Sequence, residues 1–472
     1  MSHHEMDMVV LIACGVLLLG VAAVRISSRS SMPGLLLYLG IGLFIGEAVL
    51  GIRFDDAQLA YNISALLVAL LLFDGGFTTR WSEFRPVAAR AGLLGTVGVL
   101  VSVAVASSIA MLVLGVDLRT GILMAAMVSS TDAAAVFAIL RRLPLKSKVR
   151  TTLEGESGFN DPPAIIIVTV VVSDAWNQMS VTGMIANGIF QLVAGALIGA
   201  AVAMVGQVFL HRISLPSAGL YPLATLAIAL TAHSVAGVMG GSGLLAAYIA
   251  GLWLGNQAHS ATEGFTESVS WLAQIGLFVL LGLLASPSEL PAAVVPALVI
   301  GSALTFIARP ISVLACLTPF REKLRTQLFI SWVGMRGALP IMLATIPLTH
   351  NLPGASHMFH VIFLLVVMFT LVQGPLLPRL APWAGVLERI SPRELMFDSS
   401  PLEGINASLV QFRVPRKGRL VGMWVKDLRL PRGAVVSMII RDQEVLIPNQ
   451  ELRLEAGDQL LLAVHSGLVE RV

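Results

Sequence analysis

The chain has 472 residues, of which 56% are hydrophobic and only 12% are charged. Soluble domains carry about 25% charged residues, so the composition excludes a soluble globular protein and indicates a polytopic membrane protein. The two cysteines, Cys14 and Cys316, lie far apart in apolar runs and predict neither a disulfide framework nor a metal site. The first apolar run is followed, not preceded, by Arg25 and Arg29, which predicts a retained helix with its N-terminus outside.

Apolar windows of about 17 residues or more predict thirteen membrane spans. They lie near residues 8–24, 33–51, 59–79, 91–115, 118–140, 153–173, 183–210, 219–238, 241–257, 268–286, 291–318, 327–349 and 356–380. Loops after odd-numbered spans hold most of the basic residues, whereas loops after even-numbered spans hold only Arg53 and Arg119. Because basic loops stay in the cytoplasm, this split places the C-terminus there.

An internal repeat aligns residues 34–46 with residues 243–255 at an offset of 209. Three glycine pairs match, namely Gly34 with Gly243, Gly42 with Gly251 and Gly46 with Gly255. The offset pairs the first six spans with the last six, leaves span 7 as a connector, and makes paired spans run in opposite directions. Such inverted repeats are typical of secondary transporters, whose ion sites lie near the membrane midplane where helices are broken.

Two corresponding spans contain polar or helix-breaking residues at membrane depth. Span 5 carries Ser129-Ser-Thr-Asp132, and span 12 carries Gly334-Met-Arg-Gly-Ala-Leu-Pro340. Pro340 has no N–H, so the carbonyl of Arg336 loses its helical partner. Unwound backbone is tolerated at that depth only where protein or a cavity surrounds it. The two breaks therefore predict one central site.

Span 6 opens with the acidic and amide-bearing stretch Glu154-Gly-Glu-Ser-Gly-Phe-Asn-Asp-Pro-Pro163. On a helix, Ser157 and Asp161 share one face, and Glu156 and Asn160 share another. Carboxylate, hydroxyl and amide oxygens suit a hard cation, and ionisable groups this deep predict a functional site. The alternative, that these acids cap a helix N-terminus, suits Glu154.

The charges at apparent membrane depth indicate the sign of the substrate. The acids outnumber the bases, with Asp74, Asp132, Glu154, Glu156 and Asp161 against Arg309 and Arg336. Excess carboxylate favours cations. Arg336 is expected to neutralise one acid, whereas Arg309 either faces the same cavity or reaches a surface. Asp74 and His233 are interpreted as capping or core residues.

Three motifs resemble those of the NhaP-like monovalent cation/proton antiporters, the group that includes eukaryotic sodium–proton exchangers. They are Glu156-Ser157-x-x-Asn160-Asp161, Thr131-Asp132 and Gly334-x-Arg336-Gly337-Ala338. The resemblance implies an all-α polytopic membrane protein of about thirteen transmembrane helices in an inverted-repeat (NhaA/NhaP-like) fold over residues 1–383. The family usually has proline after Thr-Asp, and here Ala133 follows.

The resemblance also implies roles for individual residues. Asp161 would bind the ion together with Asn160, Ser157, Thr131 and Asp132, and Glu156 would form a structural ion pair with Arg336. The cargo would be a monovalent cation, held through Asp161, Ser157 and Thr131, with no cofactor. The protein would be a secondary transporter rather than an enzyme, a homodimer in the lipid of the bacterial inner membrane, with no nucleic-acid partner.

The composition changes after the last span. The polar, proline-containing composition of residues 384–403 predicts a linker. The strand-like pattern of residues 404–472 predicts a small cytoplasmic α+β domain. Its expected strands lie at 408–414, 434–440, 444–447 and 459–464, with a short helix at 420–428. This domain resembles the TrkA-C (RCK-C) module, which implies regulation by a small ligand. The alternative is a stability or assembly module.

One ionisable carboxylate at Asp161 predicts electroneutral 1:1 exchange by alternating access. An aspartate in place of Asn160 would admit a second proton and make exchange electrogenic. The combination with a TrkA-C tail is typical of potassium/proton antiporters of the cell-volume-regulation type, so K⁺ is favoured and Na⁺ is the alternative. A potassium channel is disfavoured because no TVGYG filter occurs. An intramembrane protease would need Ser157 beside His233, which nothing in the sequence indicates.

Overall fold

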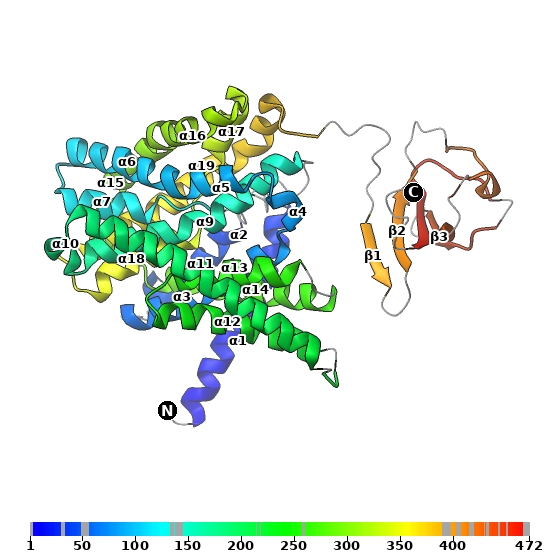
Figure 1. Cartoon of the computed structure of the whole chain (residues 1–472), viewed down its shortest axis with the longest axis horizontal. Coiled ribbons are helices and arrows are strands. Elements are labelled where there is room, and N and C mark those ends of the chain that lie inside the picture. The colour runs from blue at the N-terminus through cyan, green and yellow to red at the C-terminus, as the bar shows by residue number, and fades with distance from the viewer. Residues whose placement is uncertain are drawn as a thin grey trace. The chain divides into compact units, whose positions relative to one another are not determined.

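The structure is a computed structural model, and it describes residues 3–29, 34–48, 56–132, 136, 145–213, 215–217, 219–256, 260–388, 398–402, 407–414, 420–428, 430, 434–441, 444–449 and 452–465. Ala133, Arg53 and residues 389–397 and 403 of the expected linker lie outside these ranges. The chain divides into a membrane unit, Met1–Leu387, and a tail unit, Glu388–Val472 (Figure 1).

The regular secondary structure of the membrane unit is almost entirely helical in its described part. Its first half contains α1 (His3–Arg29), α2 (Gly34–Leu43), η1 (Phe44–Ala48), α3 (Ala57–Thr78), α4 (Trp81–Phe84), α5 (Ala88–Leu93), η2 (Leu94–Gly98), α6 (Val99–Leu114), α7 (Leu118–Met127) and α9 (Ser147–Val172). After α10 (Ala175–Gln178) and α11 (Val181–Arg212), the second half contains α12 (Leu220–Val238), α13 (Gly243–Gly255), α14 (Ser260–Leu283), η3 (Pro287–Glu289), α15 (Leu290–Ala303), η4 (Leu304–Ala308), α16 (Arg309–Leu317), η5 (Thr318–Phe320), α17 (Leu324–Val333), α18 (Ala338–Thr349) and α19 (Ala355–Ala384).

The predicted spans coincide with these helices, either singly or as two or three consecutive elements. Among the described residues, seven helices are long and apolar enough to cross a membrane, and α17 with α18, bent by 51° at their break, would be an eighth. Shorter apolar helices account for the first, second and ninth predicted spans and for the start of the fifth. Residues 133–135 and 137–140 of the fifth predicted span lie outside the described residues. The sixth is α9, whose charged residues lie between Lys148 and Asp161.

The inverted repeat is visible in the packing. Helix α2 of the first half packs on α14 of the second half. Its repeat partner α13 packs in the equivalent way on α3, the repeat partner of α14. The repeat glycines lie at these crossings, since a Cβ atom on Gly42 would overlap the Val279 carbonyl and one on Gly251 would overlap the Phe73 carbonyl. Small residues permit such close approach of helices in lipid. The π-helical turns η2 and η4 also occur in corresponding spans.

Arg119, an exception to the charge rule, has a structural partner. Its Nε donates to the Val171 carbonyl and its Nη2 to the Val172 carbonyl, both at 2.9 Å. A guanidinium at a helix C-terminus satisfies carbonyls that lack helical partners and interacts favourably with the helix dipole. Arg119 therefore fixes the end of α9 to the start of α7.

The tail unit contains one antiparallel sheet in the order β1-β2-β5-β3-β4. Its strands are β1 (Asp398–Leu402), β2 (Ala407–Arg413), β3 (Ala434–Arg441), β4 (Glu444–Leu446) and β5 (Gln459–His465). The last four match the predicted strands, whereas β1 lies where a linker was expected. Pro401 fits this assignment because β1 is an edge strand.

The helix predicted at 420–428 was wrong. Only the 3₁₀ turn η6 (Val425–Asp427) forms there. The backbone N–H of Gly422 donates to Leu454 O at 2.7 Å, and Leu454 N–H donates to Met423 O at 2.9 Å. Gly422 also adopts a φ of 85°, which is left-handed and favours glycine. Pairing with a distant segment therefore replaces the local helical hydrogen bonds.

Candidate cation site at two crossing breaks

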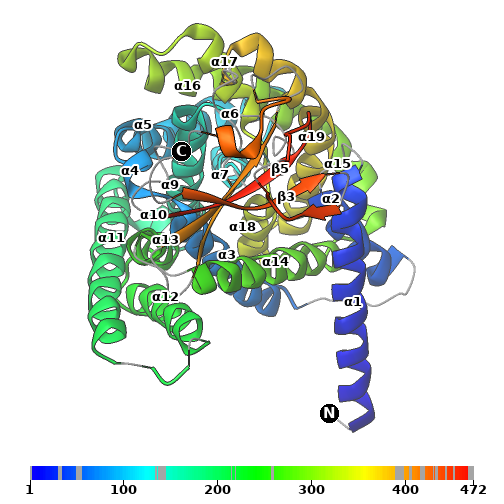
Figure 2. The same ribbon diagram turned by 90° about the vertical axis from the view of Figure 1, so that its right-hand side faces the viewer.

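Both predicted breaks exist, and they touch. The backbone is non-helical at residues 130–132, after α7, and at 334–337, between α17 and α18. The N–H of Asp132 donates to the Met335 carbonyl at 2.9 Å, which joins the two breaks directly. Helices α7, α9 and α18 lie side by side around this crossing (Figures 1 and 2).

Charged side chains compensate the helix ends that the breaks create. Arg336 Nη1 donates to the carbonyls of Ser129 and Ser130, at 2.8 and 2.6 Å, just beyond the C-terminus of α7. The Asp132 carboxylate lies at the N-terminus of α18, so close that a Cβ atom on Gly337 would overlap its Oδ2. Cations at helix C-termini and anions at N-termini are stabilising. The position of Gly337 therefore requires glycine.

Helix α9 brings the remaining predicted site residues to the first break. Ser157 Oγ donates to the Thr131 carbonyl at 2.9 Å, and Asn160 Nδ2 donates to Thr131 Oγ1 at 2.6 Å. Asp161 accepts a hydrogen bond from Ser130 Oγ at 2.6 Å and is only 6% exposed. The helix continues through its two prolines without ending. Thr131, Asp132, Ser157, Asn160 and Asp161 thus meet around one point.

The partner of Glu156 differs from the expectation. Glu156 forms its ion pair with Arg309 of α16, not with Arg336, and the two side chains are only 1% and 4% exposed. Arg336 instead donates to the carbonyls at the first break. Its own carbonyl accepts from Thr370 Oγ1 of α19 at 3.4 Å. The predicted Glu156–Arg336 pair was therefore wrong, because backbone carbonyls occupy the Arg336 side chain.

The charges gathered here leave one negative charge in excess when all are ionised. Asp132, Glu156 and Asp161 stand against Arg309 and Arg336, and all five lie around the crossing. Glu154 lies apart from them, where its Oε1 pairs with Arg150 Nε at 2.9 Å. One proton or one monovalent cation at Asp161 would make the group neutral.

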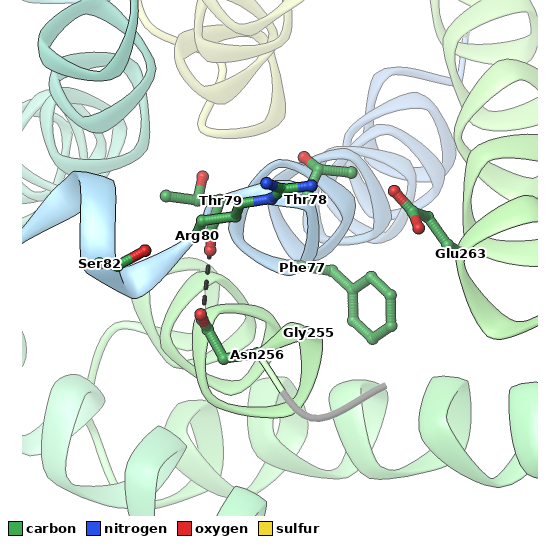
Figure 3. Close-up of a pocket in the computed structure, with 8 residues that line it drawn as sticks. All are labelled: Phe77, Thr78, Thr79, Arg80, Ser82, Gly255, Asn256 and Glu263. Carbon is green, nitrogen blue, oxygen red and sulfur yellow. Dashed lines mark hydrogen bonds between the residues drawn. The ribbon is translucent and has the colours of Figure 1, made fainter. Parts of the chain in front are cut away.

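A separate cavity of about 340 Å³ lies near the ends of α3 and α13 (Figure 3). Asn256 connects its walls, since its Nδ2 donates to the Thr79 carbonyl at 3.2 Å and its Oδ1 accepts from Trp81 N–H at 2.7 Å. Arg80 and Glu263 also line it. None of the predicted ion-binding residues borders this cavity, so we do not assign it to the cation site.

A model of the transmembrane sodium/hydrogen exchanger family matches residues 15–383. The chain belongs to this family. A TrkA-C domain model also matches residues 409–472 of the exchanger. These matches confirm the family that the sequence motifs indicated, and they make the exchanger a secondary cation/proton antiporter rather than an enzyme.

Two curated relatives extend over nearly the whole exchanger. The K(+)/H(+) antiporter NhaP2 of Shewanella baltica is 35% identical over 445 residues, covering 92% of this chain and 77% of the relative. The K(+)/H(+) antiporter NhaP of Alkalimonas amylolytica is 35% identical over 473 residues, covering 97% and 81%. The solved sodium proton antiporter MjNhaP1 of Methanocaldococcus jannaschii superposes with a TM-score of 0.70 at 23% identity, covering 80% of this chain and 99% of that one, which confirms the fold.

One contact of the site was not predicted. Ser129 and Ser130 directly precede Thr131, and the motifs predict a role for neither serine. In the structure Ser129 Oγ donates to Ala126 O of its own helix at 2.8 Å, whereas Ser130 Oγ donates to Asp161. Adjacent serines in an irregular segment point in different directions, and the sequence contains no signal that says which one faces α9.

Proposed function

We propose that this exchanger carries K⁺ across the membrane in exchange for H⁺, with Asp161 as the group that holds either ion. The observation that carries the proposal is the single excess negative charge at the crossing of the breaks. Asp161 is the carboxylate there that is paired with neither an arginine nor a helix N-terminus in the described contacts, whereas Glu156 faces Arg309 and Asp132 faces α18.

Electroneutral 1:1 exchange follows from this arrangement. With either a proton or a monovalent cation on Asp161, the group of five ionisable residues carries no net charge. Empty, it carries one negative charge, and moving that charge through a low-dielectric barrier is costly. The loaded forms therefore cross readily and the empty form does not, which couples the two fluxes. Asn160, being an amide, adds no second proton site.

The preference for K⁺ is supported by the relatives that are named K(+)/H(+) antiporters and match over most of their length. Na⁺ is the second candidate. The Na(+)/H(+) antiporter 1 of M. jannaschii is 27% identical over 346 residues, covering 70% of this chain and 80% of the relative.

The test is dissipation of an imposed pH gradient in everted membrane vesicles on addition of K⁺, Na⁺, Li⁺ or Rb⁺. The native protein should respond to K⁺, and Asp161→Asn should not respond to any of the four. Asp174→Asn is the matched control, because Asp174 is an exposed carboxylate just beyond α9. A Na⁺-only response would replace the ion and keep the mechanism. Normal exchange by Asp161→Asn would refute the proposed site.

Electroneutrality has its own test in proteoliposomes. The exchange rate at a fixed pH gradient should be unchanged by an imposed membrane potential of either sign. A rate that rises with one sign of potential would show that net charge crosses in each cycle.

We propose that the exchanger is a homodimer in the inner membrane. Its tail unit regulates exchange from the cytoplasm by binding a small ligand. Because β1 pairs with β2, a deletion should begin at Glu388 and remove the whole unit. Val386 should remain, since its carbonyl accepts from the Lys146 N–H at 2.9 Å, at the start of α9. Deletion should change the pH dependence or rate of exchange, and unchanged kinetics would favour a role in stability alone.

A further inference from the structure

The hydroxyl of Ser130 contacts the carboxylate at the centre of the proposed site. Its Oγ donates to Asp161 Oδ1 at 2.6 Å, and both side chains are almost completely buried. Within the described part of the chain, this is the one side-chain hydrogen bond that Asp161 accepts. Any ion that binds Asp161 therefore arrives next to the Ser130 oxygen.

Three hydrogen bonds hold the backbone around Ser130 in place. Arg336 Nη1 donates to the Ser130 carbonyl at 2.6 Å, Ser157 Oγ donates to the Thr131 carbonyl at 2.9 Å, and the Asp132 N–H donates to Met335 O at 2.9 Å. These contacts come from two separate parts of the chain, the second break at 334–337 and helix α9. The hydroxyl is thus presented to Asp161 by a fixed segment rather than by a mobile loop.

A hydroxyl can change its role at such a position without backbone movement. It has one donor hydrogen, which rotates, and two acceptor lone pairs. It can donate to the empty, ionised Asp161 and can turn a lone pair toward a cation that neutralises the same carboxylate. Cation sites replace the hydration shell with protein oxygens, and larger ions accept more oxygen ligands.

We propose that Ser130 is a ligand and a selectivity determinant for the transported cation, its hydroxyl oxygen favouring K⁺ over the smaller Na⁺. The proposal rests on the proposed role of Asp161 as the shared site. It assigns Ser130 a function that is separate from that of Thr131 and Ser157, whose oxygens contact other groups of the break.

The test is the concentration dependence of exchange in proteoliposomes at one fixed pH, measured for K⁺ and for Na⁺. Ser130→Ala should raise the KM for K⁺ about tenfold, the effect of one lost hydrogen-bond-sized interaction, and should leave kcat within about twofold because ground-state binding is lost. The KM for Na⁺ should rise less. Ser130→Thr keeps the hydroxyl and should restore the native KM for K⁺.

Ser331→Ala is the matched control. Ser331 is a buried serine on α17 whose Oγ donates to the Gln327 carbonyl of its own helix at 2.9 Å. It should leave both KM values unchanged. Protein levels in the membrane are compared for each variant, and if the added methyl of Ser130→Thr prevents accumulation, the contrast between the two alanine variants decides.

The possible outcomes separate this proposal from the proposed function. Loss of exchange in Asp161→Asn together with native KM values in Ser130→Ala would overturn the role of Ser130 alone. A fall in kcat with unchanged KM would also overturn it, because it would indicate a structural role. Equal rises for K⁺ and Na⁺ would overturn the selectivity role and keep the ligand role. Active Asp161→Asn would overturn both proposals.

Discussion

An arginine pairs with a buried carboxylate in each unit of the chain, but the two pairs are satisfied to very different degrees. In the tail unit, Arg441 Nε donates to Asp458 Oδ1 at 2.9 Å and Nη2 donates to Oδ2 at 2.8 Å. The N–H of Glu455 adds a third hydrogen bond to Asp458 at 2.8 Å. The carboxylate is buried, and the arginine side chain is 23% exposed to water.

In the membrane unit, Glu156 and Arg309 are both buried, and their polar atoms make few other hydrogen bonds among the described residues. Among the described residues, Glu156 Oε2 and Arg309 Nε and Nη2 have no hydrogen-bond partner. A buried pair with unsatisfied atoms contributes little net stability, although removing one partner is strongly destabilising. The tail pair therefore stabilises its fold, whereas the membrane pair adds little stability and, being neutral, no net charge beside Asp161.

The largest expected effect is on the membrane pair. Glu156→Met leaves the Arg309 charge buried and unpaired, and should lower the free energy of unfolding by about 3–5 kcal/mol. The double variant Glu156→Met with Arg309→Met should recover most of that stability, because no buried charge remains. Thermal unfolding of the purified variants in detergent measures both values. A single variant as stable as the native protein would show that the pair has water access.

The second effect concerns the glycine beside Asp132. Gly337→Ala places a methyl group where Asp132 Oδ2 lies, so the crossing must shift, at a cost of about 1–3 kcal/mol. The exchange rate should fall at least tenfold while the amount of protein in the membrane stays unchanged. Gly237→Ala on α12 is the control, since nothing lies within 4 Å of its added Cβ. Normal exchange by Gly337→Ala would show that the break tolerates the displacement.

The third effect is a pH dependence in the tail unit. Burial by itself would raise the pKa of Asp458, but the hydrogen bonds from Arg441 and the Glu455 N–H, with the Arg441 charge, lower the pKa below its usual value. A lowered folded-state pKa means that the stabilisation is complete above the unfolded-state value, about 3.9, and is lost as pH falls through the folded-state value.

Hydrogen exchange of tail amides in the full-length protein can follow this loss. Protection of β3 and β5 should fall on acidification below about pH 4. Asp458→Asn should lower protection at neutral pH by about 1–3 kcal/mol and remove this residue's share of the acid sensitivity. An identical acid profile in both proteins would assign the sensitivity to other carboxylates.

The smallest effect is expected for a neutral group of the proposed cation site. Ser157→Ala removes the hydrogen bond from its Oγ to the Thr131 carbonyl, worth about 0.5–1.5 kcal/mol. Exchange should slow by several-fold, well short of the loss in Asp161→Asn. Initial rates at saturating K⁺ in the vesicle assay measure this. Complete inactivation would place Ser157 on a level with the charged residues.

The sequence was sufficient to locate the helices and both breaks. Long apolar runs leave few alternatives in lipid, and Ser129–Asp132 and Gly334–Pro340 interrupt them visibly. The sequence was insufficient to identify the ion-pair partner of Glu156, because two arginines are candidates. Arg309 and Arg336 are both deep arginines, and only the crossing of the breaks shows that backbone carbonyls occupy Arg336.

In the tail unit, two elements could not be predicted from the sequence because they depend on pairing with distant residues. Residues 420–428 have a helical pattern, yet their backbone pairs with residues 452–454, a contact that local periodicity does not record. The strand β1 contains mostly polar residues and a proline, so no alternation of apolar residues marks it. Its assignment depends on the neighbouring β2, which supplies the ladder.

The crossing of the two breaks also constrains the order of events during synthesis. The carbonyls of Ser129 and Ser130 find their donor, Arg336, 207 and 206 residues later in the chain. At about 5–20 residues per second, the first break waits on the order of ten seconds or more for this partner. Unpaired backbone groups are not tolerated in hydrocarbon, so span 5 can settle at its final depth only after span 12 has been made. The half of the protein that holds Asp161 is synthesised first, and the proposed ion site is completed last.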